Sequence, residues 1–303
     1  MDLTVILLAG GTMLILALVA GYLLGLANKV FHVEVDPRIE AVNAALPGAN
    51  CGGCGFVGCM SYAEAVAGGK APPTKCTVGG EACAKEIAKI MGVEVAQSWP
   101  YRPAVHCRAA YADRLGRHSY LGEKTCTAAN LVSGVQGCAY GCMGFGDCAR
   151  ACEFDAIHVV DGLATVDYEK CVGCGACAKA CPRNIISMTP FKADRMLIIA
   201  CSNKDFGKDV RAVCKVGCIG CKACTKACGL FTVTDNLPRI DYDQYDPNTM
   251  NAAQLAIDKC PAKGIVYVGK PTKKDLEKVA DKEAPALVEA DFKTTVDKTE
   301  WQG

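Results

Sequence analysis

The 22 cysteines of this 303-residue chain lie in tight, regularly spaced groups, and this feature limits what the chain can fold into. Three kinds of protein use cysteine so heavily: disulfide scaffolds, zinc-binding domains and iron–sulfur proteins. Disulfide scaffolds are short secreted chains, whereas this chain is long enough for two domains or more. We therefore expect most of these cysteines to be metal-bound thiolates.

The most regular group is Cys171-x2-Cys174-x2-Cys177-x3-Cys181, followed by Pro182. In two-cluster ferredoxins, three cysteines with this spacing bind one [4Fe–4S] cluster and the fourth binds its neighbour. A zinc ribbon needs only pairs of ligands, so a third cysteine at the same three-residue spacing favours an iron–sulfur cluster. Residues 138–190 are therefore predicted to hold two clusters, one on Cys138, Cys142, Cys148 and Cys181, the other on Cys171, Cys174, Cys177 and Cys152.

Residues 191–270 repeat this unit with changes. Residues 154–168 and 230–242 each follow a Cys-x3-Cys pair, and each is expected to form a hairpin, turning at Asp161-Gly162 and at Asp235-Asn236. A third ferredoxin-type cluster is predicted on Cys218, Cys221, Cys224 and Cys260.

The partner of that third cluster is predicted to be lost. Tyr245, Asn248 and Asn251 stand where the first unit has Cys171, Cys174 and Cys177. None of these three residues replaces a cluster thiolate well, so Cys228 is left without its expected partners. The ring of Tyr245 is expected to fill space near Cys228.

An earlier module, residues 29–95, carries Cys51, Cys54, Cys59 and Cys76. Glycines crowd the first three cysteines, which favours a backbone wrapped around an inorganic cluster. The spacing matches neither ferredoxin nor a zinc finger, so zinc remains an alternative. A helix is expected over 81–91, closed by Gly92.

The N-terminal run Leu3–Asn28 contains no charged residue and is long enough to cross a bilayer. A cleaved signal peptide is the alternative, but such a peptide begins with basic residues and has a shorter apolar core. Lys29 and Arg38 follow the run, so the positive-inside rule places the rest of the chain in the cytoplasm. Residues 96–137 are interpreted as a linker, and 271–303 as a charged, flexible tail.

Six cysteines lie outside these predicted sets. Cys83 is expected to be a packed free thiol. Cys107, Cys126, Cys201 and Cys214 fit no complete motif, and an extra cluster that they share with Cys228 is an alternative.

Composition and motif content narrow the range of functions that this chain can have. A net charge of +1 and 7% aromatic residues argue against nucleic-acid binding. No glycine-rich dinucleotide motif follows a predicted strand, so NAD chemistry is expected elsewhere. A basic run between residues 204 and 226 is either solvated surface or a docking surface for an acidic protein; it comprises Lys204, Lys208, Arg211, Lys215, Lys222 and Lys226.

The order of these parts resembles the B subunits of Rnf complexes, which are the iron–sulfur subunits of ion-translocating ferredoxin:NAD oxidoreductases. The resemblance rests on the apolar N-terminus, Cys51-Gly-Gly-Cys54-Gly-Phe-x-Gly-Cys59, Tyr62-Ala-Glu-Ala-Val66, Lys75-Cys76-x3-Gly80-Glu81 and the ferredoxin-like motifs, and it covers residues 1 to about 270. The block from Cys51 to Cys76 is also similar to the cluster domain of corrinoid iron–sulfur proteins, which implies [4Fe–4S] there.

Together, the motifs and the resemblance predict an α+β chain with one transmembrane helix, a small four-cysteine domain, tandem ferredoxin-like modules and about four [4Fe–4S] clusters. The resemblance also implies an electron-relay subunit of a translocase at the cytoplasmic membrane, with soluble ferredoxin as donor, other membrane subunits as partners and no complete catalytic activity alone. The alternatives are an anchored polyferredoxin of another membrane reductase and a zinc-stabilised interaction scaffold.

Overall fold

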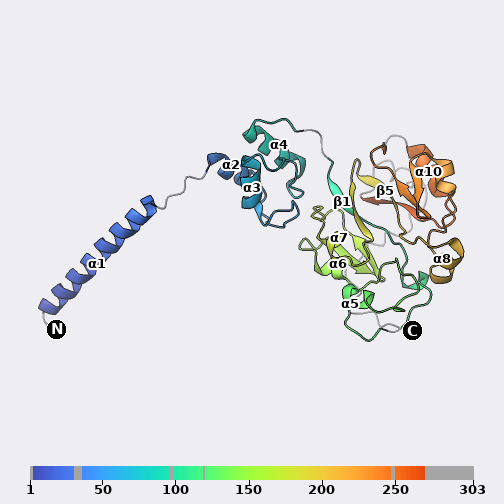
Figure 1. Cartoon of the computed structure of the whole chain (residues 1–303), viewed down its shortest axis with the longest axis horizontal. Helices are drawn as coiled ribbons and strands as arrows, with labels where there is room; N and C mark the ends of the chain where they lie inside the picture. The colour runs from blue at the N-terminus through green and yellow to red at the C-terminus, as the bar shows by residue number, and fades with distance from the viewer. Residues whose placement is uncertain (1–2, 31–35, 96–98, 119, 247–249, 270–303) are drawn as a thin grey trace, which may run out of the picture.

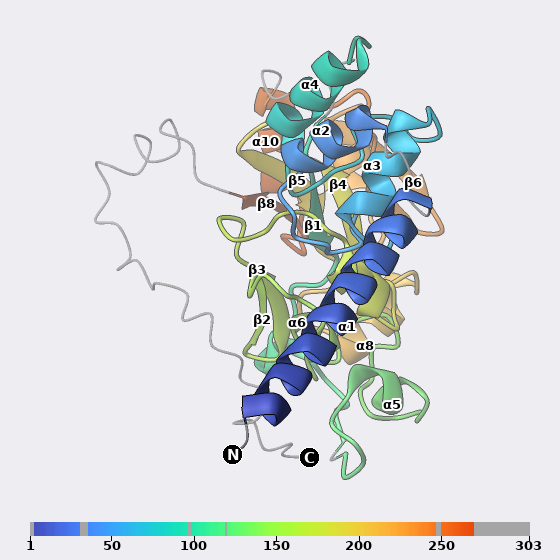
Figure 2. The same ribbon diagram turned by 90° about the vertical axis from the view of Figure 1, so that its left-hand side faces the viewer.

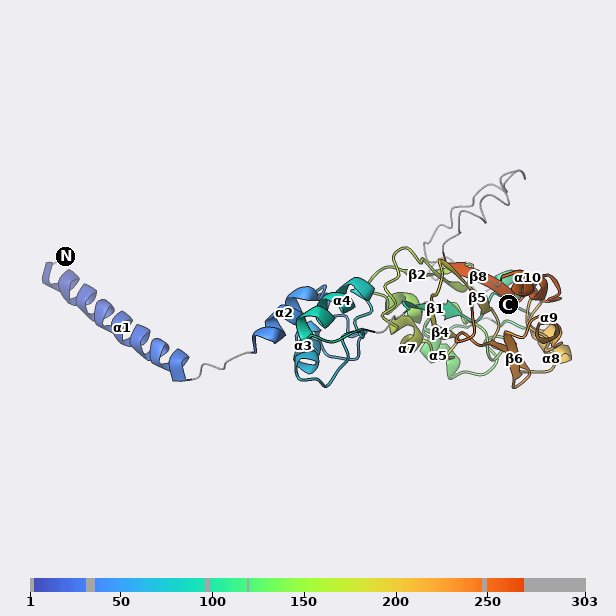
Figure 3. The same cartoon turned by 90° about the horizontal axis from the view of Figure 1, so that it is seen from above.

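The computed structural model describes residues 3–30, 36–95, 99–118, 120–246 and 250–269. Three parts follow one another: a long N-terminal helix, a small helical domain, and a larger part that mixes short helices with two-stranded sheets (Figures 1 and 3). The α+β class predicted from the sequence is confirmed.

The N-terminal helix α1 spans Leu3–Val30. Its segment Gly10–Val30 is long and apolar enough to cross a membrane, and none of its most apolar stretch is buried. Leucines such as Leu8 and Leu16 are 70% and 68% exposed. A helix that is apolar on every side is suited to lipid rather than to water. By length and composition, α1 therefore fits a membrane span.

The helical domain consists of α2 (Pro37–Ala45), α3 (Cys59–Ala67) and α4 (Gly80–Met91), which lie together in all three views (Figures 1, 2 and 3). Its core joins Val42, Tyr62 and Ile87, one residue from each helix, and each is at most 1% exposed. Helix α4 ends at Gly92, which adopts the left-handed conformation with φ +66°. The predicted helix and its glycine cap are thus confirmed.

The larger part is built from two similar units. The first contains β1 (Tyr101–Val105), α6 (Asp147–Arg150), β2 (Ile157–Val160), β3 (Leu163–Val166), α7 (Ala176–Ala180) and β4 (Ile186–Pro190). The second repeats this order with β5 (Arg195–Ile199), α9 (Ala223–Ala227), β6 (Phe231–Thr234), β7 (Leu237–Ile240), α10 (Met250–Asp258) and β8 (Ile265–Gly269). After its first strand the first unit also carries the 3-10 helix η1 (Tyr111–Asp113) and α5 (Cys126–Asn130), and the second carries α8 (Gly207–Val213).

Each unit pairs its first strand with its last and its two middle strands with each other, all antiparallel. The middle strands form the predicted hairpins. Asp161 and Gly162 have φ of +46° and +75°, and Asp235 and Asn236 have +51° and +60°. Two successive positive φ values are the signature of the two-residue type I′ turn. Both predicted turns are therefore confirmed.

Strand β1 lies inside the segment 96–137 that the sequence indicated as a linker. It pairs with β4 from Tyr101↔Pro190 to Val105↔Ile186. It also lies directly against the cysteine loop of the first unit. The approach is so close at Gly173 that a Cβ there would collide with the carbonyl of Tyr101. The segment thus supplies a structural strand of the first unit.

The two units contact each other just beyond their first strands. His106 Nδ1 lies 2.7 Å from the carbonyl oxygen of Ile199, and Ser202 Oγ donates to the His106 carbonyl at 2.8 Å. Nearby, the Leu115 amide donates to the Val213 carbonyl at 3.0 Å. Polar groups of the two units therefore form hydrogen bonds with each other across this boundary.

Candidate metal centres

In the helical domain, the four cysteines predicted as one ligand set lie around the start of α3 and the loop before α4. Cys54, Cys59 and Cys76 all pack against the domain core, while Cys51 precedes them on the same glycine-rich loop. The Asn50 side chain accepts a hydrogen bond from the Cys59 amide at 2.8 Å, which holds this loop against α3.

Tyr62 holds the segment that carries Cys76, the last cysteine of that set. Its hydroxyl donates to the Pro72 carbonyl at 2.8 Å and accepts from the Lys75 amide at 3.2 Å, so it positions the segment that carries Cys76. The Gly79 amide donates to Cys76 Sγ at 3.4 Å. Amide donors of this kind stabilise a thiolate and suit a metal-bound sulfur.

Cys83 is 7% exposed and packs in the domain core, as expected for a buried thiol. Its sulfur lies between the Ala45 carbonyl, 3.3 Å away, and Cys76. A hydrogen bond from Cys83 lowers the pKa of Cys76, and the same interaction raises the pKa of Cys83. Cys83 therefore acts as a neutral neighbour of the ligand set rather than as a fifth thiolate.

In the first unit, one cavity is lined by Cys152, Cys171, Cys174 and Cys177. These are the four residues that the ferredoxin spacing groups together. The Ala156 amide donates to Cys152 Sγ at 3.4 Å. Burial raises the pKa of Cys177 to about 12, so a metal that binds here would have to displace the proton of this thiol.

A second cavity of this unit is lined by Cys126, Cys142, Cys148 and Cys181. Three of them are predicted partners, but Cys126 stands in the place that spacing assigns to Cys138. Cys126 begins α5, and the Asp147 carboxylate accepts from its amide at 2.8 Å and from the Thr127 amide at 2.9 Å. Asp147 thereby ties α5 to the start of α6, next to Cys148.

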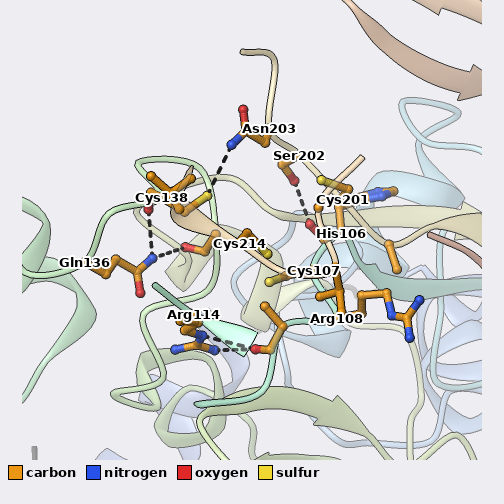
Figure 4. Close-up of a pocket in the computed structure, with 16 residues that line it drawn as sticks. His106, Cys107, Arg108, Arg114, Gln136, Cys138, Cys201, Ser202, Asn203 and Cys214 are labelled. Carbon is orange, nitrogen blue, oxygen red and sulfur yellow. Dashed lines mark hydrogen bonds between the residues drawn. The ribbon is translucent and has the colours of Figure 1, made fainter. Parts of the chain in front are cut away.

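Cys138 lies on a different cavity, together with Cys107, Cys201 and Cys214 (Figure 4). The sequence left these last three cysteines unassigned. The internal repeat nevertheless relates these cysteines in pairs. Cys107 and Cys201 each lie two residues after the first strand of a unit. Cys138 and Cys214 lie four residues before Cys142 and Cys218, respectively.

In the second unit, a cavity is lined by Cys218, Cys221, Cys224 and Cys260, the four residues of the third predicted ferredoxin-type set. The Gly264 amide donates to Cys260 Sγ at 3.4 Å. Cys221 is the exposed member, whereas Cys224 is buried. This site therefore reaches the molecular surface at Cys221.

In the second unit, the residue that takes the place of Cys171 lies in the hydrophobic core. Tyr245 is 3% exposed and belongs to a core against which Cys228 packs. Helix α10 runs for nine residues where the first unit has the five-residue α7. Asn248 lies outside the described residues, as does the side chain of Asn251 in α10.

The cysteine sets offer thiol donors alone. Among the described residues, no group of three or more His, Cys, Asp or Glu side chains has the arrangement of a single-ion site. Four cysteine-lined cavities of the two units are alike in size, with volumes of about 20 to 30 Å³ each. Four cysteine thiols around one cavity are the donor set of an iron–sulfur cluster.

Comparison with known proteins supports iron–sulfur clusters in this chain. A protein-family model described as "Putative Fe-S cluster" matches residues 46–78, and one described as "4Fe-4S binding domain" matches 164–187. The chain is 41% identical over 277 residues to the B subunit of the Na⁺-translocating ferredoxin:NAD⁺ oxidoreductase complex of Acetobacterium woodii, covering 89% of this chain and 81% of that protein. The chain belongs to the family of Rnf B subunits.

Two further members of the family support this assignment. The B subunit of the ion-translocating oxidoreductase complex of Methanosarcina acetivorans is 40% identical, with 82% of this chain and 94% of that protein covered. The B subunit of the proton-translocating ferredoxin:NAD⁺ oxidoreductase complex of Clostridium ljungdahlii is 39% identical, with 68% and 72% covered. As a member of the Rnf B family, the chain is an electron-transfer iron–sulfur subunit of a multi-subunit redox complex.

Proposed function

We propose that this subunit takes electrons from reduced ferredoxin and relays them, one at a time, toward membrane subunits of an ion-translocating oxidoreductase. The observation that carries the proposal is the series of four-cysteine sites along the chain, ending at the exposed Cys221. An anchored polyferredoxin of another reductase would show the same sites, but the family membership favours the Rnf-type complex.

The residues proposed to hold the clusters fall into four sets. These are Cys51, Cys54, Cys59 and Cys76; Cys126, Cys142, Cys148 and Cys181; Cys152, Cys171, Cys174 and Cys177; and Cys218, Cys221, Cys224 and Cys260. When bound, a [4Fe–4S] cluster supplies reversible one-electron oxidation and reduction. The chain contributes the thiolates, the amide donors to their sulfurs and an apolar surround that limits water.

Ferredoxin is proposed to dock on the second unit, where the basic run meets the exposed Cys221. Lys222 adjoins this cysteine, and Lys208, Arg211, Lys215 and Lys226 are also exposed. Lys204 forms an ion pair with Asp235 at 3.0 Å, so part of its charge is already compensated. The aromatic ring of Phe206, 76% exposed, offers an apolar contact among these charges. An acidic electron donor would be steered to the surface nearest a cluster.

Charge reversal tests this docking surface. Changing Lys215, Lys222 and Lys226 to Glu should slow the oxidation of reduced ferredoxin by at least about tenfold at low ionic strength, and much less at high salt. Stopped-flow rates measured over a range of salt concentrations would show this. The matched control reverses Lys70, Lys85 and Lys89, three exposed lysines of the helical domain, and should leave the rate nearly unchanged. Equal slowing by both triple variants would contradict a docking surface at Cys221.

Helix α1 is proposed to anchor the subunit as a single membrane span with the cysteine-bearing parts in the cytoplasm. It carries no Asp, Glu, Lys, Arg or His before Lys29, so the ion path is assigned to other subunits of the complex. Lys29 and Arg38 follow the apolar run, as the positive-inside rule requires. Protease added to sealed inside-out vesicles should digest the cysteine-bearing parts, and digestion only in right-side-out vesicles would refute this orientation.

A further inference from the structure

The cavity between the two units is lined by four cysteines that come from both of them (Figure 4). Cys107 and Cys138 belong to the first unit, and Cys201 and Cys214 to the second. We propose that these four residues hold a fifth [4Fe–4S] cluster, which joins the two ferredoxin-like units.

The repeat explains why two cysteines come from each unit. Cys107 follows β1 at the same distance as Cys201 follows β5. Cys138 and Cys214 are equivalent in the same way, each four residues before the first ferredoxin-type ligand of its unit. Equivalent positions of two similar units therefore face each other at this site. Such an arrangement is typical of a site that two units share at their interface.

Two of the sulfur atoms border one point of the cavity, and two of the four lie near hydrogen-bond donors. A Cβ placed on Gly141 would lie 3.4 Å from Cys138 Sγ and 3.8 Å from Cys107 Sγ, so both sulfurs border the same point. The Cys218 amide donates to Cys201 Sγ at 3.2 Å, and Asn203 Nδ2 lies 3.6 Å from Cys138 Sγ. Donors directed at sulfur stabilise thiolates that are bound to iron.

Two residues that line this cavity each have one polar atom without a partner among the described residues. Arg114 is 9% exposed, and its Nε and Nη2 bond to backbone carbonyls while Nη1 is unpaired. The Gln136 amide donates to the Cys138 and Gly141 carbonyls, which leaves its own oxygen Oε1 unpaired. A buried cation without an anion is costly. The Arg114 guanidinium lies over the Tyr111 ring, 5.4 Å from its centroid, and forms no ion pair with a carboxylate of the described residues. A cluster with four thiolates is negatively charged and would supply a counter-charge.

Other roles for these four cysteines, two of which are buried, fit this place less well. All four are free thiols here, and Cys201 and Cys214 are each 8% exposed. Their cavity has a volume of about 30 Å³, similar to the 20 Å³ of the cavity at Cys218, Cys221, Cys224 and Cys260. Well-packed thiols would leave no such space. Five sets of four then account for all of the 22 cysteines except Cys83 and Cys228.

The site itself does not depend on the proposed relay, but its use as a bridge between the units does. Iron and acid-labile sulfide should be measured on the anaerobically purified full-length chain, which should contain about twenty irons. Cys107→Ala and Cys214→Ala should each lose about four irons, and the double variant no more than either single one, because both residues serve one cluster. The controls Cys83→Ala and Cys228→Ala should keep the full iron content.

Any of three results would overturn the proposal: full iron content in either single variant, a loss of about eight irons in the double variant, or about one zinc ion per chain. If these variants aggregate, Asn203→Ala tests the same site with every cysteine in place. It removes one donor to Cys138, so the iron content should stay unchanged and one cluster potential should become more negative in a redox titration followed by electron paramagnetic resonance. Potentials that all remain at their wild-type values would overturn the proposal.

Discussion

Replacing Cys126 with serine is expected to remove about four irons from the chain, the content of one [4Fe–4S] cluster. Cys126 lines one cavity with Cys142, Cys148 and Cys181, and Asp147 holds it there through the Cys126 amide. Loss of one thiolate leaves three ligands, and the cluster becomes labile. Iron and sulfide analysis, together with Mössbauer spectroscopy of the anaerobic protein, measures the loss.

Double variants show which cysteines share a cluster. Cys126→Ser combined with Cys148→Ser should lose no more iron than either change alone, because both residues belong to one set. Cys126→Ser combined with Cys152→Ser should lose about eight irons, because these residues belong to different sets. A Cys126→Ser protein with full iron content would contradict the structural grouping and favour Cys138 as the fourth ligand.

Cys152 and Cys228 occupy equivalent positions in the two units, but they are expected to respond oppositely to substitution. Cys152→Ser should remove about four irons, since Cys152 shares a cavity with Cys171, Cys174 and Cys177. Cys228→Ser should remove none, because Cys228 packs against the core that contains Tyr245. The same iron assay measures both variants, and each serves as the control for the other.

Two results would contradict this second prediction. Loss of iron from Cys228→Ser would show that the second unit keeps a second cluster despite Tyr245. Full iron in Cys152→Ser would show that the exchange of the fourth ligand does not operate in the first unit. The far-ultraviolet circular dichroism of both variants should match that of the unchanged protein, so that loss of iron is not confused with loss of fold.

Much of the fold could be predicted from local sequence. The turns at Asp161-Gly162 and Asp235-Asn236 were predictable because few residues accept two successive positive φ values. The C-terminal cap Gly92 was predictable for the same reason. Strand β1 was missed because Pro100 and Pro103 argue against a strand, although a proline is tolerated at the edge of a two-stranded sheet.

The cysteine grouping was predictable only where the ligands are close together in sequence. Cys171, Cys174 and Cys177 lie on one short loop, so their spacing alone groups them, whereas Cys126 enters its set from a separate helix. Spacing favours Cys138 as the fourth partner of Cys142, whereas the structure places Cys126 on that cavity, because Asp147 ties α5 to the start of α6. The repeat marks Cys107, Cys138, Cys201 and Cys214 as equivalent pairs, but it does not show that they share a cavity, since that cavity forms only where the two units meet.

The central claim is that these cysteines hold redox-active iron–sulfur clusters, and the metal content and visible spectrum of the anaerobically purified full-length chain test it most directly. The account predicts a brown protein with equal amounts of iron and acid-labile sulfide, at least about sixteen of each per chain, and broad visible absorption that dithionite bleaches. A colourless protein with several zinc ions per chain and no sulfide would contradict it, and would instead support a zinc-stabilised scaffold.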